Sequence, residues 1–149
     1  MPTYFVDSSA LVKRYRSEPR SRYLARLIDN AERLIASRLT KVEVTAALVR
    51  RARGSNQPAE ILNNAVAALE TELQNSFELI ELDELLMEQA AALAREHAMR
   101  GADAVQLACL LLARRDDPDN ELFLLSADDE LNAAAFAEGL QVENPNLHP

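Results

Sequence analysis

Short apolar segments alternate with helical segments along the whole chain. The residues that favour strands occupy 3–6, 33–37, 77–82, 121–126 and 140–144. Apolar residues at helical spacing, capping residues and glycine stops predict helices between them. The first helix runs from Asp7 or Ser8 to Tyr15, and the second follows Pro19. The others cover residues 39–53, 58–75, 84–99, 102–115 and 128–139. Strands that alternate with helices predict an α/β fold, a central parallel sheet of four to five short strands with helices on both faces.

The length and the cysteine content set the expected organisation and compartment. The 149 residues contain no repeat and no long linker, so we expect one domain over 1–149. We expect no membrane partner, because no apolar run reaches the 18 residues that indicate a membrane span. The start of the chain does not resemble a signal peptide, and the single Cys109 excludes an internal disulfide. These features predict a cytoplasmic protein in which Cys109 is a small buried apolar residue.

Charge is distributed unevenly along the chain. The net charge is −8, which argues against a protein that simply coats nucleic acid. Residues 1–54, however, hold 12 Lys and Arg against 5 Asp and Glu, whereas residues 55–149 hold 4 against 19. The basic third can supply contacts to phosphates. The candidates flank the first acid and end the 39–53 helix: Lys13, Arg14, Arg16, Arg50, Arg51 and Arg53.

Four acids stand where a parallel sheet usually binds its ligands, or close to it. Asp7 and Asp128 follow the first and fourth predicted strands, and ligands bind at the carboxyl ends of such strands. Glu43 lies among apolar neighbours that predict a largely buried helix. Asp103 stands in the first turn of the most apolar helix of the chain.

Each acid also has a structural alternative. Asp7 and Asp128 can cap helices, Glu43 can form a capping box with Thr40, and a helix N-terminus alone stabilises a carboxylate such as Asp103. The short motifs around the acids offer no basic residue expected to neutralise them. Clustered carboxylates repel one another unless a cation lies among them, and an all-oxygen site suits Mg²⁺ or Mn²⁺.

Four blocks together resemble a known family. "FVDSSALVKRY" (5–15), "LTKVEVTAALVRR" (39–51), "RGADAVQLACLLL" (100–112) and "LLSADDELNAAAFAEGL" (124–140) are similar to the signature blocks of PIN-domain nucleases, especially the VapC-like toxins of type II toxin–antitoxin systems. The resemblance implies a PIN-like α/β/α sandwich with an acidic pocket. It also implies RNA phosphodiester hydrolysis by water that Mg²⁺ or Mn²⁺ activates.

The resemblance also assigns roles by position. Asp7, Glu43 and Asp103 match the first three acids of the family, which are expected to be catalytic and to bind the metal. Asp128 is the expected fourth acid, two residues after Ser126, with the adjacent Asp129 as the alternative. Ser126 and the hydroxyl residue after the first acid, Ser8, are expected to hydrogen-bond a carboxylate or a metal-bound water.

The expected partners are an RNA substrate, a cognate antitoxin and a second copy of the chain in a homodimer. The alternatives are a housekeeping PIN ribonuclease and a non-catalytic PIN-fold module that binds RNA or protein. A haloacid-dehalogenase phosphatase would need an acid at Ser9 and a lysine beyond Lys41, and the sequence has neither. His97 is expected to be an exposed residue at a helix end, without a catalytic role.

Overall fold

Five parallel strands form one sheet in the computed structural model, which describes residues 2–16 and 20–148. The strands are β1 (Thr3–Val6), β2 (Arg33–Ser37), β3 (Glu78–Ile80), β4 (Leu122–Leu125) and β5 (Gln141–Glu143), in the spatial order β3-β2-β1-β4-β5. The predicted α/β class and the parallel sheet are confirmed. The two edge strands have three residues each, shorter than predicted, because each pairs with one neighbour only.

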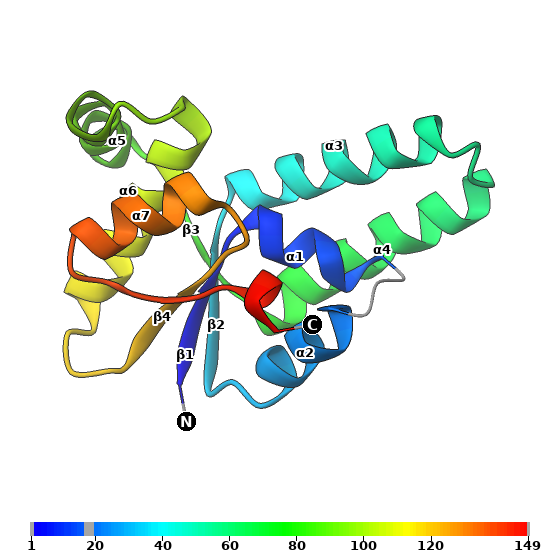
Figure 1. The fold of residues 1–149 in the computed structure, drawn as a ribbon, viewed down its shortest axis with the longest axis horizontal. Helices are drawn as coiled ribbons and strands as arrows, with labels where there is room; N and C mark the ends of the chain where they lie inside the picture. The colour runs from blue at the N-terminus through cyan, green and yellow to red at the C-terminus, as the bar shows by residue number, and fades with distance from the viewer. Residues whose placement is uncertain (1, 17–19, 149) are drawn as a thin grey trace.

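In the described residues, seven α-helices connect and cover these strands (Figure 1). They are α1 (Ser8–Arg14), α2 (Arg20–Asp29), α3 (Leu39–Gly54), α4 (Ala59–Ser76), α5 (Glu84–His97), α6 (Gly101–Asp116) and α7 (Asp129–Ala137), and a 3₁₀ turn, η1 (Pro145–Leu147), follows β5. The predicted helices are present with ends shifted by one or two residues. None of the helices in the described ranges combines the length and the apolar character that a membrane crossing needs.

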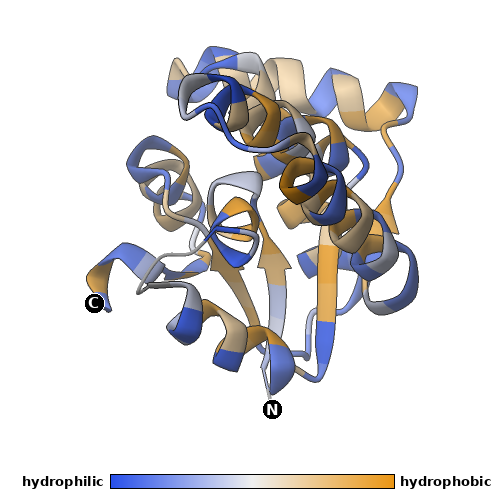
Figure 2. Ribbon diagram, turned by 90° about the vertical axis from the view of Figure 1, so that its right-hand side faces the viewer, coloured by the Kyte–Doolittle hydropathy of each residue, from blue (hydrophilic) through white to orange (hydrophobic). Residues whose placement is uncertain are grey.

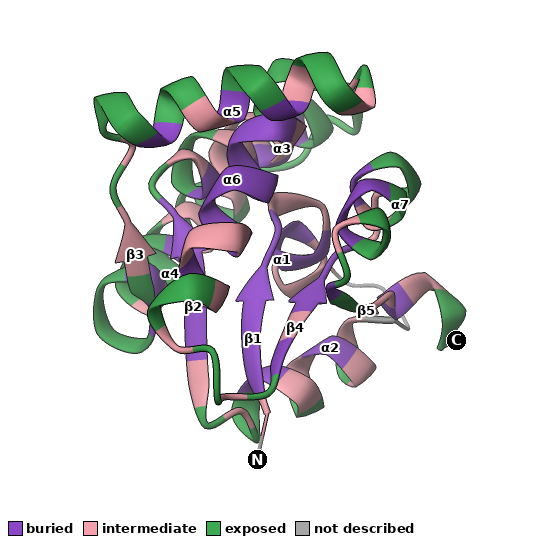
Figure 3. Ribbon diagram, turned by 90° about the vertical axis from the view of Figure 1, so that its left-hand side faces the viewer, coloured by how far each residue is buried: buried purple, intermediate pink, exposed green. Residues whose placement is uncertain are grey.

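Alternating side chains of the strands divide the core into two layers. In β1, Tyr4 and Val6 pack with α1, α2, α3 and α4, whereas Phe5 packs with α5, α6 and α7. The central position of β1 buries all four of its residues (Figure 3). Figure 2 shows the hydrophobic residues of the strands enclosed by helices that carry hydrophilic residues. Cys109 of α6 is buried, as expected.

Helices α3 and α4 run side by side and extend beyond the sheet (Figure 1). Because they pack mainly on each other there, α3 buries only one stripe, which includes Val44 and Leu48. Val42 is 64% exposed, so the expectation of a largely buried helix around Glu43 is wrong. Glu43 itself lies at the base of this pair of helices, close to the sheet, and is half-buried.

The strand order fixes where a ligand can reach the sheet. From β1 the chain continues to β2 on one side, whereas β4 pairs with β1 on the other side. This switch in direction leaves a crevice at the carboxyl ends of β1 and β4. Asp7 and Ser126 are the first residues beyond these two ends.

Candidate functional site

A pocket of about 440 Å³ opens at this crevice. Its walls come from α1, α3, the start of α6 and the residue before α7. All four acids singled out from the sequence line it: Asp7, Glu43, Asp103 and Asp128. The structure therefore brings together carboxylates that lie up to 121 residues apart in the chain.

Asp7 is the most buried of the four acids, with 3% of its surface exposed. Its Oδ2 accepts hydrogen bonds from the Ser9 hydroxyl (2.6 Å), the Ser9 backbone N–H (3.2 Å) and the Ser126 hydroxyl (3.2 Å). The bond from Ser9 N–H makes Asp7 the N-cap of α1 as well. Burial raises the pKa of Asp7; the bonds from Ser9 and Ser126 lower it, while the nearby Glu43 raises it further. Asp7 is therefore a helix cap and a pocket residue at the same time.

Glu43 is held by side chains from two other helices. Its Oε1 accepts hydrogen bonds from the Ser8 hydroxyl (3.1 Å) and from the Gln106 amide (3.0 Å). The capping-box alternative for Glu43 is wrong, because α3 begins at Leu39 and Thr40 lies inside the helix. The Thr40 hydroxyl instead accepts a bond from the same Gln106 amide, at 3.1 Å. Gln106 therefore ties the base of α3 to α6.

Asp103 carries a buried oxygen, Oδ2, that has no hydrogen-bond partner. Burial raises the pKa of Asp103 to about 6, and the carboxylates of Asp128 and Asp7 raise it as well. Asp128 stands opposite as the N-cap of α7, where its Oδ1 accepts the Leu131 N–H at 2.9 Å. Asp129 is exposed and does not line the pocket, which favours Asp128 as the fourth acid of the site.

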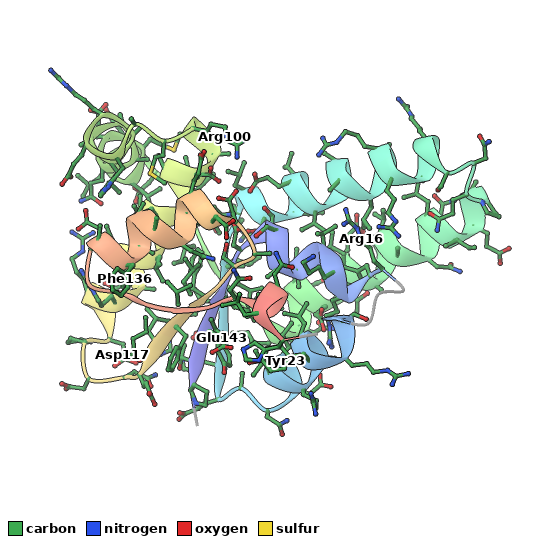
Figure 4. All side chains as sticks on the ribbon, viewed as in Figure 1. Arg16, Tyr23, Arg100, Asp117, Phe136 and Glu143 are labelled. Carbon is green, nitrogen blue, oxygen red and sulfur yellow. The ribbon has the colours of Figure 1, made fainter. Side chains whose placement is uncertain are left out.

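Arg100 is a site residue that the sequence reasoning missed. One guanidinium nitrogen lies 3.6 Å from Asp103 Oδ2 and another lies 3.6 Å from Asp128 Oδ2. The expectation that the acidic motifs contain no neutralising base is therefore wrong. The Arg100 side chain lines the pocket and is 75% exposed, so it reaches the acids from the solvent side (Figure 4). Its position just before the α6 helix, three residues ahead of Asp103, was the available sequence signal.

Ser9 and Gln106 were also missed as supporting residues. Ser9 is in the first turn of α1, where its hydroxyl also accepts the Ala127 N–H at 3.0 Å. Gln106 is a buried polar residue in an otherwise apolar helix, and such a residue needs a partner. Ser8 and Ser126 bond to carboxylates as expected, Ser8 to Glu43 and Ser126 to Asp7.

Two other sequence expectations have mixed outcomes. Among the candidate phosphate contacts, Arg50 lines the pocket, whereas Arg14 bonds to Glu72 at 2.8 Å and also pairs with Asp29.

The expectation of an exposed His97 is wrong, because only 16% of its side chain is accessible. Its Nε2 shares a hydrogen bond of 2.8 Å with Glu138.

The chemistry of the pocket fits a divalent cation. The donors are carboxylate oxygens, and the buried Asp103 Oδ2 has no hydrogen-bond partner, so it is available to a cation. In the described part of the chain, no three of these acids bring oxygen atoms within 4.8 Å of one another. A bound cation would offset the mutual repulsion of the carboxylates and draw them closer together. Mg²⁺ and Mn²⁺ prefer such all-oxygen sites.

The raised pKa of Asp103 predicts how stability changes with pH. The value of about 6 lies above the unfolded value of about 3.9, so ionised Asp103 destabilises the fold. This cost is fully present above pH 6 and is relieved as pH falls toward 4. With a chelator present, we expect the Tm of the wild type to rise relative to that of Asp103→Asn as the pH is lowered from 7.5 to 5. Thermal melts across this range test it, and two parallel Tm curves would contradict it.

The fold and the acidic pocket together define a class of protein. The parallel order β3-β2-β1-β4-β5, with acids after β1 and β4, on α3 and at the start of α6, is the arrangement of a PIN domain. The sequence matches the PIN domain family over residues 4–137. A full-length relative, "Ribonuclease VapC45" of Mycobacterium tuberculosis, is 35% identical over 149 residues, covering 100% of both chains. The chain therefore belongs to the PIN domain family, among relatives that are VapC ribonucleases.

Solved structures share the fold at lower sequence identity. The Mycobacterium tuberculosis VapC20, described as a sarcin-ricin loop cleaving toxin, has a TM-score of 0.67 and 21% identity, and the match covers 88% of this chain and 94% of that one. A chain of a toxin–antitoxin complex from Klebsiella pneumoniae has a TM-score of 0.63 and 21% identity, with 95% and 97% covered. At these identities the two structures establish the shared fold.

Proposed function

We propose that this chain is an endoribonuclease that depends on Mg²⁺ or Mn²⁺ and serves as the toxin of a toxin–antitoxin pair. One observation carries the proposal: four carboxylates from separate segments meet in one pocket, where a buried Asp103 oxygen has no hydrogen-bond partner. The full-length relative named as a ribonuclease supports RNA as the substrate. The proposal takes residues 1–149 as one functional PIN domain.

In this proposal the supporting residues hold the acids ready for the cation. Ser9 and Ser126 hold Asp7, while Ser8 and Gln106 hold Glu43, so these two carboxylates keep their orientation before an ion arrives. Asp103 and Asp128 complete the ligand set from the opposite wall. When bound, the ion supplies a polarised water and positive charge for the hydrolysis of the phosphodiester.

Two arginines can hold the RNA backbone at the same pocket. Arg50 of α3 and Arg100 before α6 both line it. A phosphodiester that enters the pocket meets their guanidinium groups, which suit phosphate recognition. We propose that they position the scissile phosphate over the acids and stabilise the charge that develops on it.

The antitoxin is the proposed partner that controls this site. The Klebsiella pneumoniae structure is titled as a toxin–antitoxin complex, which supports a protein partner of this kind. In this chain, Val42 lies at the pocket and is 64% exposed. An antitoxin segment that covers this apolar side chain beside the acids would block RNA entry. A homodimer is the second proposed assembly.

The experiment follows RNA cleavage by the purified chain. We expect discrete cuts with Mn²⁺ or Mg²⁺, products with 5′-phosphate and 3′-hydroxyl ends, and no cuts after chelation. Mapping of RNA 5′ ends with and without the metal measures this. RNA binding without cleavage would instead favour a non-catalytic PIN-fold module. Induction in a heterologous bacterium separates a toxin, which arrests growth, from a housekeeping ribonuclease, which does not.

A further inference from the structure

A second group of ligand-type side chains lies away from the acidic pocket. Glu96 and His97 end α5, and Glu138 follows the last residue of α7. One ligand atom from each of these residues lies within 4.8 Å of the other two. Within the described residues, this is the one set of three that meets this spacing. We propose that Glu96, His97 and Glu138 form a site for a transition-metal ion, with Zn²⁺ as the best fit.

The geometry of the group is close to that of metal ligands. His97 Nε2 and Glu138 Oε1 are 2.8 Å apart. Two ligand atoms that each lie about 2.0–2.1 Å from a zinc ion in tetrahedral geometry are about 3.3 Å apart. A shift of a few tenths of an ångström therefore turns the hydrogen-bonded pair into two ligands. The ion would take the place of the hydrogen that the two atoms now share: His97 would bind through Nε2 as the neutral tautomer with its proton on Nδ1, and any displaced proton would pass to water.

Two of the three ligands are already held in place. Glu138 is the C-cap of α7, where its backbone N–H donates to the carbonyls of Ala134 and Ala135. Its own carbonyl accepts a bond of 2.9 Å from Arg114. His97 is the last residue of α5, and its side chain is mostly buried. Fixed ligands lose little freedom when the ion binds, which favours its affinity.

The donor set selects the class of ion. An imidazole nitrogen with two carboxylate oxygens suits zinc and its neighbours better than Mg²⁺, which prefers oxygen ligands alone. Exposed Glu96 faces solvent, so water can complete the coordination and the ion can enter. The nearby cation Arg114, which donates to the Glu138 carbonyl, repels a metal ion. We therefore expect a site of moderate affinity.

A bound ion would link the ends of two helices that the chain connects only through α6 and β4. Glu96 and His97 precede the short segment that leads to Arg100 and Asp103. The ion would thus restrain the start of that segment against α7 without contributing to the acidic pocket. This role is structural, and it is independent of the proposed ribonuclease activity.

The test is a zinc titration of the full chain after metal removal. Asp103→Asn serves as the background, so that the acidic pocket contributes as little binding as possible. We expect one zinc per chain by calorimetry and a higher Tm with zinc. His97→Gln in this background should weaken binding at least about tenfold and lose the Tm shift, because it removes the nitrogen ligand.

A second histidine provides a matched control. His148 Nε2 lies 2.9 Å from Glu143, but this pair has no third ligand at the required spacing among the described residues. His148→Gln should therefore bind zinc as the background does. A zinc concentration of about 100 µM fills a site of micromolar Kd. The proposal is overturned if zinc at this concentration gives neither heat nor a Tm shift. It is equally overturned if His97→Gln binds zinc unchanged, or if His148→Gln loses the binding.

Discussion

Replacing Asp7 with asparagine is expected to slow RNA cleavage at least about 1000-fold, a loss of about 4 kcal/mol of transition-state stabilisation. Asparagine has the same shape but no charge, so it cannot bind the cation as a carboxylate does. The folded structure should survive, because the Asn oxygen can still accept bonds from Ser9 and Ser126. The Tm should stay level or rise, since burial raises the pKa of Asp7 and its ionised form costs stability. Initial cleavage rates and thermal melts of both proteins measure these effects.

Asp83→Asn is the matched control for this experiment. Asp83 is also an N-cap aspartate, accepting the Leu86 N–H at 2.9 Å at the start of α5, but it does not line the pocket. We expect this variant to lose at most about 1 kcal/mol of stability and to keep its cleavage rate. If Asp7→Asn cuts RNA as fast as Asp83→Asn does, then Asp7 is only a helix cap and the proposed role is wrong.

Replacing Arg100 with glutamine is expected to lower kcat/KM about 10- to 100-fold and, in the same protein, to tighten Mn²⁺ binding. Arg100 now acts as a cation 3.6 Å from both Asp103 and Asp128, so it competes with a metal ion for these two acids. Its loss leaves the acids with fewer positive neighbours and strengthens metal binding. The same loss removes a partner for the scissile phosphate, which slows cleavage. Calorimetry with Mn²⁺ and cleavage kinetics report the two effects separately.

Arg95→Gln controls for the loss of one positive charge. Arg95 is an exposed residue of α5 that does not line the pocket. It should change metal affinity and cleavage by less than about twofold, because exposed charges at a distance are screened. Arg100 has no special role at the site if the two variants behave alike. If Arg100→Gln binds Mn²⁺ more weakly, the competition argument fails, although the phosphate argument still stands on the kinetics.

The strands and the acids were readable from the sequence because their signals are local. A short apolar run followed by Asp7 or Ser126 indicates where a strand ends and where polar residues begin at the edge of the sheet. The chain direction of parallel strands then places such residues on one edge of the sheet. The four acids predicted for the pocket all line it, although their catalytic and metal-binding roles remain predictions.

The errors all concern contacts between segments that are distant in sequence. Arg100 was missed because half of its role depends on Asp128, which only the packing of α7 near α6 brings close. Thr40 resembled a helix cap, but its hydroxyl accepts from Gln106, 66 residues away. Val42 resembled a core residue because its apolar character does not reveal that it faces the pocket between distant segments. The type of a side chain indicates its preference for a local secondary structure, whereas tertiary packing determines which distant residues it contacts.

The separation of the four acids along the chain has a consequence for how the protein is made. Asp7 leaves the ribosome early, but Asp128 and the helix it caps come from the last quarter of the chain. The pocket also needs β4, which is synthesised just before Asp128 and pairs directly with β1. A nascent or prematurely terminated chain therefore cannot assemble the cutting site. For a nuclease whose proposed target is RNA, synthesis itself delays activity until β4 and Asp128 have been made, which leaves time for a partner to meet the chain.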